Sequence, residues 1–264
     1  QRTMAVPRPV ALLPDCATII TQWIEAPTLR TVLLNERRQT ALMAVGAAAA
    51  WLANFHATSA QKRHTFRPDY VLTPVSNELA SGLRPSGARQ MRRFYDALDR
   101  LETLATALRG TTIPWTTLHY DANCQNFLFD GESAYGFDIH NTAPGDPMKD
   151  FARLLVEADL LWRHHWGRPR SAVSRPVLDA VVQRAGIQLS SDVEARLRVH
   201  LLSASLIKYL RTPRTQAAVH RQQRRRALAI ATAAASFRFN PRATPFLLGR
   251  PWRPEIVSPP AGPA

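Results

Sequence analysis

The sequence predicts an α+β fold, in which a small β-containing segment precedes a mostly helical body with one embedded hairpin. Three observations indicate this fold. The run ATIITQWI at 17–24 is rich in β-branched and aromatic residues, which favours a buried strand. An Asp-Gly step at 130–131 separates two short apolar runs, which is a typical hairpin signal. Much of the remaining chain spaces its apolar residues at helical intervals.

Two long helices are expected before the hairpin, over 36–57 and 88–109. The second is clearly amphipathic, with an apolar stripe of Met91, Phe94, Leu98, Leu101, Leu104 and Leu108. The polar, proline-containing segment 58–86 between them predicts a long connection with a short helical turn around 77–82. Beyond the hairpin, helices are expected after Pro147 and at 174–185, 192–209 and 215–235.

The chain is strongly basic. Its net charge of +14 comes almost wholly from arginine, since it has only three lysines. This balance favours anionic partners such as phosphates, nucleic acid or a membrane surface. A solvated arginine background without any partner is the alternative. One late helix concentrates charge, which prompts the hypothesis of a basic module that binds nucleic acid or an anionic surface through Arg221, Arg224, Arg225 and Arg226.

Other patterns argue against several classes of protein. Cys16 and Cys124 are far apart, so neither a zinc site nor a disulfide framework is indicated, and a reducing compartment is expected. The longest apolar run, 41–55, is shorter than the roughly 20 residues that a membrane span needs. No secretory signal opens the sequence. We therefore expect a cytoplasmic protein.

The segment 117–150 concentrates the residues that could carry chemistry. It contains a His-x-Asp step, an Asn five residues after Asp121, and a second Asp at the end of the expected hairpin. Asp121, Asn126 and Asp138 offer carboxylate and amide oxygens, which are ligands that Mg²⁺ accepts. Phosphoryl transfer needs a metal to hold the phosphates and a carboxylate to orient the acceptor hydroxyl. The segment therefore suits a phosphotransferase.

These motifs resemble a known family. The pattern H-x-D-x4-N, a hairpin, an apolar-Asp-apolar step and G-D-P-x-x-D resembles the aminoglycoside phosphotransferase and choline kinase group of protein-kinase-like enzymes. The matching segments are LHYDANCQNFLF, YGFDI and PGDPMKDFARLL, and TIITQWIEAPTL resembles the strand and hinge between the two lobes. The resemblance runs in order through 10–165. It implies a partial β N-terminal lobe and hinge at 1–27, a helical C-terminal lobe with the catalytic loop at 28–240, and a proline-rich tail at 241–264.

The resemblance implies an ATP-dependent kinase that moves the γ-phosphoryl group to a hydroxyl of a small molecule, such as a sugar, amino sugar or amino alcohol. Asp121 would be the catalytic carboxylate, and Asn126 and Asp138 would bind Mg²⁺. Main-chain groups of the hinge would bind adenine at Gln22, Trp23 and Ile24. Three further residues would shape the site, namely His119 in the loop, Asp146 and Asp150. For the last two, capping of a helix N-terminus is the alternative.

The sequence also departs from the family pattern. Tyr120 stands where the family usually has Gly, Asn123 replaces a second His, Gln125 replaces a Gly, and Ile139 replaces an aromatic residue. Tyr120 and Gln125 bear on the backbone geometry of the loop. The phosphate-covering loop, strand lysine and partner Glu of the family are expected before residue 10, where there is no room for them. Because the sequence begins at Gln1 rather than Met, we expect a truncated N-terminal lobe and an impaired activity of the chain as it stands.

Two alternatives to an active kinase follow, an inactive pseudokinase or scaffold and the basic module described above. Retention of all three predicted site residues, Asp121, Asn126 and Asp138, favours the kinase. As partners we expect a small-molecule hydroxyl substrate and no nucleic acid, while peripheral contact with an anionic membrane stays open. The charge of +14 disfavours polycationic acceptors, although Glu157 and Asp159 could line an acidic cleft.

Overall fold

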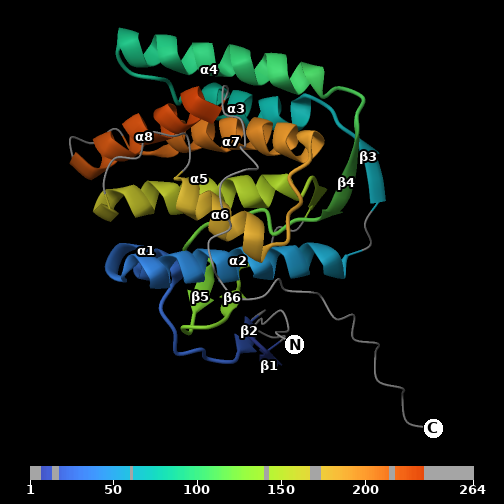
Figure 1. The fold of residues 1–264 in the computed structure, drawn as a ribbon, viewed down its shortest axis with the longest axis vertical. Coiled ribbons are helices and arrows are strands. Elements are labelled where there is room, and N and C mark those ends of the chain that lie inside the picture. The colour runs from blue at the N-terminus through green and yellow to red at the C-terminus, as the bar shows by residue number, and fades with distance from the viewer. Residues whose placement is uncertain are drawn as a thin grey trace.

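A computed structural model describes residues 7–13, 18–59, 62–139, 143–166, 174–213 and 218–234. Its helices are α1 (Leu29–Asn35), α2 (Arg38–Thr58), α3 (Asp69–Ala80), α4 (Ala88–Ala107), α5 (Met148–Trp166), α6 (Arg175–Arg184), α7 (Ser191–Arg211) and α8 (Ala218–Ala234). Its strands are β1 (Pro9–Leu13), β2 (Thr18–Thr21), β3 (Lys62–Thr65), β4 (Thr112–Thr117), β5 (Phe127–Phe129), β6 (Ala134–Gly136) and β7 (Pro144–Gly145). The predicted α+β fold is confirmed, with stacked helices and two small hairpins beyond α2 (Figure 1).

Helix α2 is the central apolar element of the lower layer. Its small residues allow close packing, and a Cβ at Gly46 would lie only 2.6 Å from Arg184 on α6. Within the described part of the chain, α2 alone is long and apolar enough to cross a membrane. A core helix passes the same test, and α2 packs against α1, α5 and α6. The separate helix α1 was not predicted; it begins after Thr28, whose side chain accepts a hydrogen bond from the Thr31 backbone N–H at 3.2 Å.

The predicted hairpin is formed by β5 and β6. These strands pair antiparallel, with Phe127 opposite Gly136, and the turn uses Gly131 at a φ of +101°. The hairpin lies directly on α2, because a Cβ at Gly136 would be 2.5 Å from the ring of Trp51. This close approach fixes where the residues just beyond β6 lie.

The segment 58–86 is more ordered than the sequence indicates. It contains the four-residue strand β3 and the 12-residue helix α3, which accommodates Pro74 in its interior. β3 pairs with β4, about fifty positions further along, with Lys62 opposite Trp115. The buried strand expected at 17–24 is also shorter than predicted: β2 ends at Thr21, and Trp23 is 86% exposed.

The basic run on α8 is only partly exposed. The Arg224 guanidinium lies 4.7 Å from the ring centre of Tyr209, and Arg226 donates two hydrogen bonds to Asp159, at 2.9 and 2.6 Å. Burial lowers the pKa of Arg226, and the Asp159 carboxylate opposes this effect. Arg221 and Arg225 remain exposed. Only two of the four arginines in the basic-module hypothesis are therefore exposed on α8, and the predicted tail at 241–264 lies outside the described residues.

Candidate active site

The loop between β4 and β5 brings Asp121 and Asn126 together. The Asn126 side-chain amide donates to the Asp121 carboxylate at 3.0 Å and to its backbone carbonyl at 2.9 Å. Arg153 on α5 forms an ion pair with the other carboxylate oxygen of Asp121 and donates to the backbone carbonyl of Tyr120 at 3.2 Å. The Arg153 contact was not predicted from the sequence.

These contacts keep Asp121 ionised. Partial burial by itself raises the pKa of the Asp121 carboxyl, but the Arg153 guanidinium and neighbouring side-chain amides outweigh burial. The pKa of Asp121 therefore lies below its ordinary value. The side chain keeps 36% of its surface exposed, so a ligand can still reach it.

Two hydrogen bonds to the backbone of Phe137, one of them from a side chain, hold Asp138 beside this loop. The Phe137 N–H donates to the Asn126 carbonyl at 3.1 Å, and the His119 ring donates through Nε2 to the Phe137 carbonyl at 3.0 Å. Asp138 itself is exposed and adopts a φ of 62°, in the left-handed region that Asp tolerates better than most residues. The structure thus places Asp138 one residue beyond a segment bonded to Asn126.

The donor set at this position fits Mg²⁺. Asn126 commits its amide nitrogen to Asp121, so its amide oxygen is left for a cation, and Asp138 adds an exposed carboxylate. Amide and carboxylate oxygens, completed by phosphate and water, are the usual ligands of Mg²⁺. No cluster of three or more His, Cys, Asp or Glu side chains that could hold a metal occurs among the described residues.

Asp150 anchors the loop between β4 and β5. Its buried carboxylate accepts hydrogen bonds from the backbone N–H groups of His119 and Tyr120, at 2.8 and 3.1 Å. It also contacts the His56 Nε2 on α2 at 2.9 Å. Asp150 therefore joins α5, α2 and the loop, and its contacts extend well beyond the helix-capping alternative.

Tyr120 occupies a strained position. Its φ is 68°, in the left-handed region that is costly for residues other than Gly, by roughly 1–2 kcal/mol. The loop thus keeps a conformation suited to the Gly that the family usually has here, and the hydrogen bond to Asp150 helps to hold it. The Lys149 ammonium lies 4.0 Å from the centre of the Tyr120 ring.

His119 and Asp146 are buried, at 1% and 3% exposure. The rings of Trp51, Phe55 and Phe127 surround His119. Asp146 accepts a hydrogen bond from the Met148 backbone N–H at 2.9 Å and from Arg196 at 2.7 Å.

His200 lies 3.4 Å from the second Asp146 oxygen. Burial raises the pKa of Asp146, but His200 and Arg196 outweigh burial, so the pKa lies below its ordinary value. Asp146 thus caps α5 and ties it to α7.

A cavity of about 650 Å³ lies along the predicted hinge. Gln22, Trp23 and Ile24 all line it, together with residues from the start of α1 and from the β5–β6 hairpin. Phe137, one of these lining residues, directly precedes Asp138. We call this cavity the hinge pocket. It lies next to the candidate metal residue.

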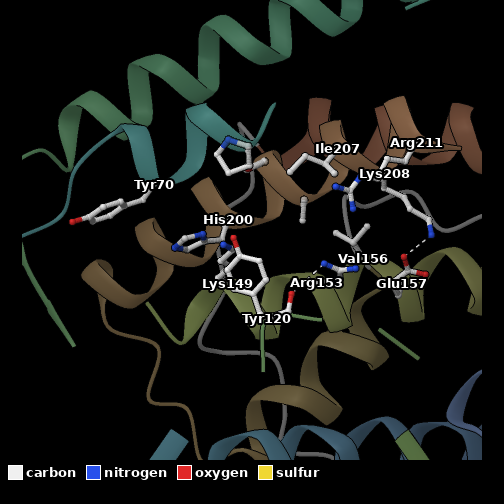
Figure 2. Close-up of a pocket in the computed structure, with 13 residues that line it drawn as sticks. Tyr70, Tyr120, Lys149, Arg153, Val156, Glu157, His200, Ile207, Lys208 and Arg211 are labelled. Atoms are coloured by element: carbon white, nitrogen blue, oxygen red, sulfur yellow. Dashed lines mark hydrogen bonds and ion pairs between the residues drawn. The ribbon is translucent and has the colours of Figure 1, made fainter. Parts of the chain in front are cut away.

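A second cavity, of about 150 Å³, lies between α3, α5 and α7. Tyr120 and Arg153, the neighbour and the ion-pair partner of Asp121, both line it. Figure 2 shows the side chains of α5 and α7 that face each other across this space. We call this cavity the acceptor pocket. The loop between β4 and β5 therefore borders this cavity through Tyr120.

Comparisons with known proteins show the family and the fold of this chain. A sequence model of the phosphotransferase enzyme family (APH) matches residues 1–200. A choline/ethanolamine kinase family protein from Mesorhizobium loti superposes with a TM-score of 0.61 at 15% identity, over 88% of this chain and 77% of the other. A thermostable mutant of aminoglycoside phosphotransferase APH(4)-Ia gives 0.56 at 15% identity, over 89% and 79%. A glucosamine kinase gives 0.58 at 16% identity, over 87% and 64%. No curated protein matches the sequence significantly.

Proposed function

The chain belongs to the phosphotransferase enzyme family, and from this premise we propose that it transfers the γ-phosphoryl group of ATP to a hydroxyl of a small molecule. The observation that carries the proposal is the hydrogen bond between Asp121 and Asn126, with Asp138 tied to Asn126 through Phe137. A carboxylate for the hydroxyl and oxygen ligands for a metal thus lie side by side. Phosphoryl transfer relies on positioning and charge stabilisation rather than on covalent help from the protein.

The proposed reaction assigns one role to each group. The acceptor hydroxyl approaches Asp121 from the acceptor pocket, and the ionised carboxylate accepts its hydrogen bond. The hydroxyl oxygen bonds to the γ-phosphorus as the bond to the β–γ bridging oxygen breaks, and Asp121 receives the proton. Asn126 and Asp138 would hold Mg²⁺, which supplies neutralisation of charge on the phosphates when bound. ADP then carries the bridging oxygen away.

The hinge pocket is the proposed site for the nucleotide base. Its lining is mainly apolar, and Trp23 presents most of its ring to solvent there. Phe137 and Leu128 of the hairpin close the pocket on the side of Asp138. A base bound along 22–24 would thus lead its phosphates toward Asn126 and Asp138. The cofactors of the proposed function are ATP and Mg²⁺.

The test separates catalysis from nucleotide binding. We expect Asp121→Asn to lower ATP turnover by roughly 10²- to 10⁴-fold, because proton acceptance is lost, and to leave ATP affinity nearly unchanged. Turnover is measured by ADP release, and affinity by calorimetry. Asp96→Asn, an exposed change on α4, is the matched control.

Retained turnover in Asp121→Asn would contradict the role of Asp121. ATP binding without turnover of any acceptor by a chain that carries the family's phosphate-covering loop and strand lysine would instead favour the inactive scaffold.

A further inference from the structure

We propose that the acceptor pocket is built for a molecule that carries a phosphate or carboxylate group, and that Lys149 and Arg153 bind this group. The inference rests on the proposed function, because it names the class of the acceptor hydroxyl compound. Its starting point is the charge of the pocket lining. Four cationic side chains line the cavity, against one carboxylate, that of Glu157: Lys149, Arg153, Lys208 and Arg211.

Three of the four cations already have carboxylate partners. Lys208 donates to Glu157 at 2.5 Å, Arg211 pairs with Glu78, and Arg153 pairs with Asp121. The single lining carboxylate is therefore occupied, and Asp159 is fully buried with Arg226 rather than at the pocket. A cationic acceptor would find no uncommitted acidic side chain among the described residues of this pocket.

Lys149 is the exception among the cations. Its ammonium group packs on the face of Tyr120, and no carboxylate of the described residues lies within ion-pair distance. In Figure 2 its side chain lies beside Tyr120, on the same side of the pocket as Arg153. A ring face compensates an ammonium charge less than a carboxylate does. Lys149 is thus a positive group ready for an anionic ligand.

Arg153 connects this anion site to catalysis. It is half-buried, and it holds the carboxylate of Asp121 that the acceptor hydroxyl must reach. An anionic group on the acceptor competes with Asp121 for the guanidinium, because both are oxyanions that Arg binds in the same way. Binding of such an acceptor would free the carboxylate for the hydroxyl. A neutral or cationic acceptor offers no such exchange.

The experiment observes Lys149 directly, because the chain has only three lysines. Lysine labelled with ¹³C at Cε gives one NMR signal for each of the three lysines, Lys62, Lys149 and Lys208. The signal that disappears in Lys149→Gln is assigned to Lys149. The chain is titrated with inorganic phosphate, glucose 6-phosphate, glucose and glucosamine. We expect the two phosphate compounds to shift the Lys149 signal saturably, while exposed Lys62 on β3 barely responds.

Two variants define the effect on affinity. Lys149→Gln should weaken binding of glucose 6-phosphate about tenfold or more, the usual consequence of losing a charged hydrogen bond. Arg92→Gln, which removes one exposed charge on α4, should leave the affinity unchanged. The affinity of the unaltered chain should fall with added salt. A Lys149 shift no larger than that of Lys62, or equal affinity of both variants, would overturn the inference.

Turnover distinguishes the two proposals. Faster phosphorylation of glucosamine than of glucose 6-phosphate would overturn the anionic class while the kinase function stands. Saturable phosphate binding at Lys149 without any phosphorylation would leave the anion site intact and contradict the proposed function.

Discussion

The two pockets beside the catalytic loop differ in how they can recognise a ligand. The hinge pocket is about 650 Å³, and Glu25 is its single charged lining residue among the described ones. The acceptor pocket is about 150 Å³ and is lined by four cations. An apolar pocket next to exposed backbone suits a flat base, whereas a charged pocket selects its ligand by charge. The difference suggests that one side recognises a shared cofactor and the other a particular substrate.

The largest effect is expected at Asp150, which holds the loop beside the two pockets. Asp150→Ala removes the acceptor of two loop N–H groups and the partner of His56. We expect a loss of about 3 kcal/mol in the free energy of unfolding, as is typical when a buried charged partner is removed, together with weaker binding in both pockets. Urea unfolding measures the first quantity.

The control is Asp179→Ala, which breaks a surface pair with Arg175 and should cost under about 0.5 kcal/mol. Equal losses in Asp150→Ala and this control would show that Asp150 does not anchor the loop.

Acid is expected to weaken the wall of the acceptor pocket through Asp146. The pKa of Asp146 is lower in the folded chain than in the unfolded chain, so its ionisation stabilises the fold above the unfolded pKa of about 4. This contribution is lost as pH falls below about 4 toward the folded pKa. Because Arg196 and His200 belong to α7, the wall of the acceptor pocket should loosen first. Thermal unfolding followed from pH 7 to pH 2.5 should show a shallower decline for Asp146→Asn than for the unaltered chain, and identical slopes would refute the assignment.

The hinge pocket is tested by Trp23→Ala. Because Trp23 is 86% exposed, the change should leave stability unaltered. Loss of stacking on a base should weaken ATP binding by about tenfold, since such contacts contribute roughly 1–3 kcal/mol. The Lys149 response to phosphate should not change.

Tyr95→Ala removes an aromatic side chain exposed to 41% on α4 and serves as the control. If ATP affinity is the same in both variants, the base does not contact Trp23.

The smallest effect concerns the backbone between the pockets. Tyr120→Gly and Tyr120→Ala both remove the ring beside Lys149, but only Gly adopts a φ of 68° without strain. We expect the Gly variant to be more stable than the Ala variant by about 1 kcal/mol. Chemical denaturation of the two variants measures the difference, and a more stable Ala variant would contradict the strain.

The sequence allowed prediction of the hairpin and most long helices because these elements depend on neighbours along the chain. The Asp-Gly turn and the stripe of α4 are local patterns. The turn is confirmed, and Phe94 and Leu101 of the stripe are buried, but Met91 at its start is 43% exposed. β3 and β4 were missed because their pairing joins distant segments, and α3 was missed because Pro74 is usually a helix breaker. Only tertiary contacts decide such elements.

In the candidate site, too, local motifs could be predicted and contacts between distant segments could not. Motif spacing placed Asp121, Asn126 and Asp138 in one predicted site, and the structure brings the first two into contact. The metal and catalytic roles remain predictions. No pattern in the sequence predicts the ion pair between Arg153 and Asp121, because Arg153 lies on α5, 32 positions after Asp121. Asp159 was misread for the same reason, since its partner Arg226 lies on α8.

Gly136 has a consequence for how this chain can vary. Any side chain there would meet the Trp51 ring at 2.5 Å, so Gly136→Ala alone should push the hairpin, and Asp138 with it, away from α2. A smaller residue at 51 would create the missing space. The size of the side chain allowed at position 136 therefore depends on the size of the side chain at position 51, although 85 positions separate them in the sequence. Their joint exchange offers a way to change the position of Asp138 without substituting Asp138 itself.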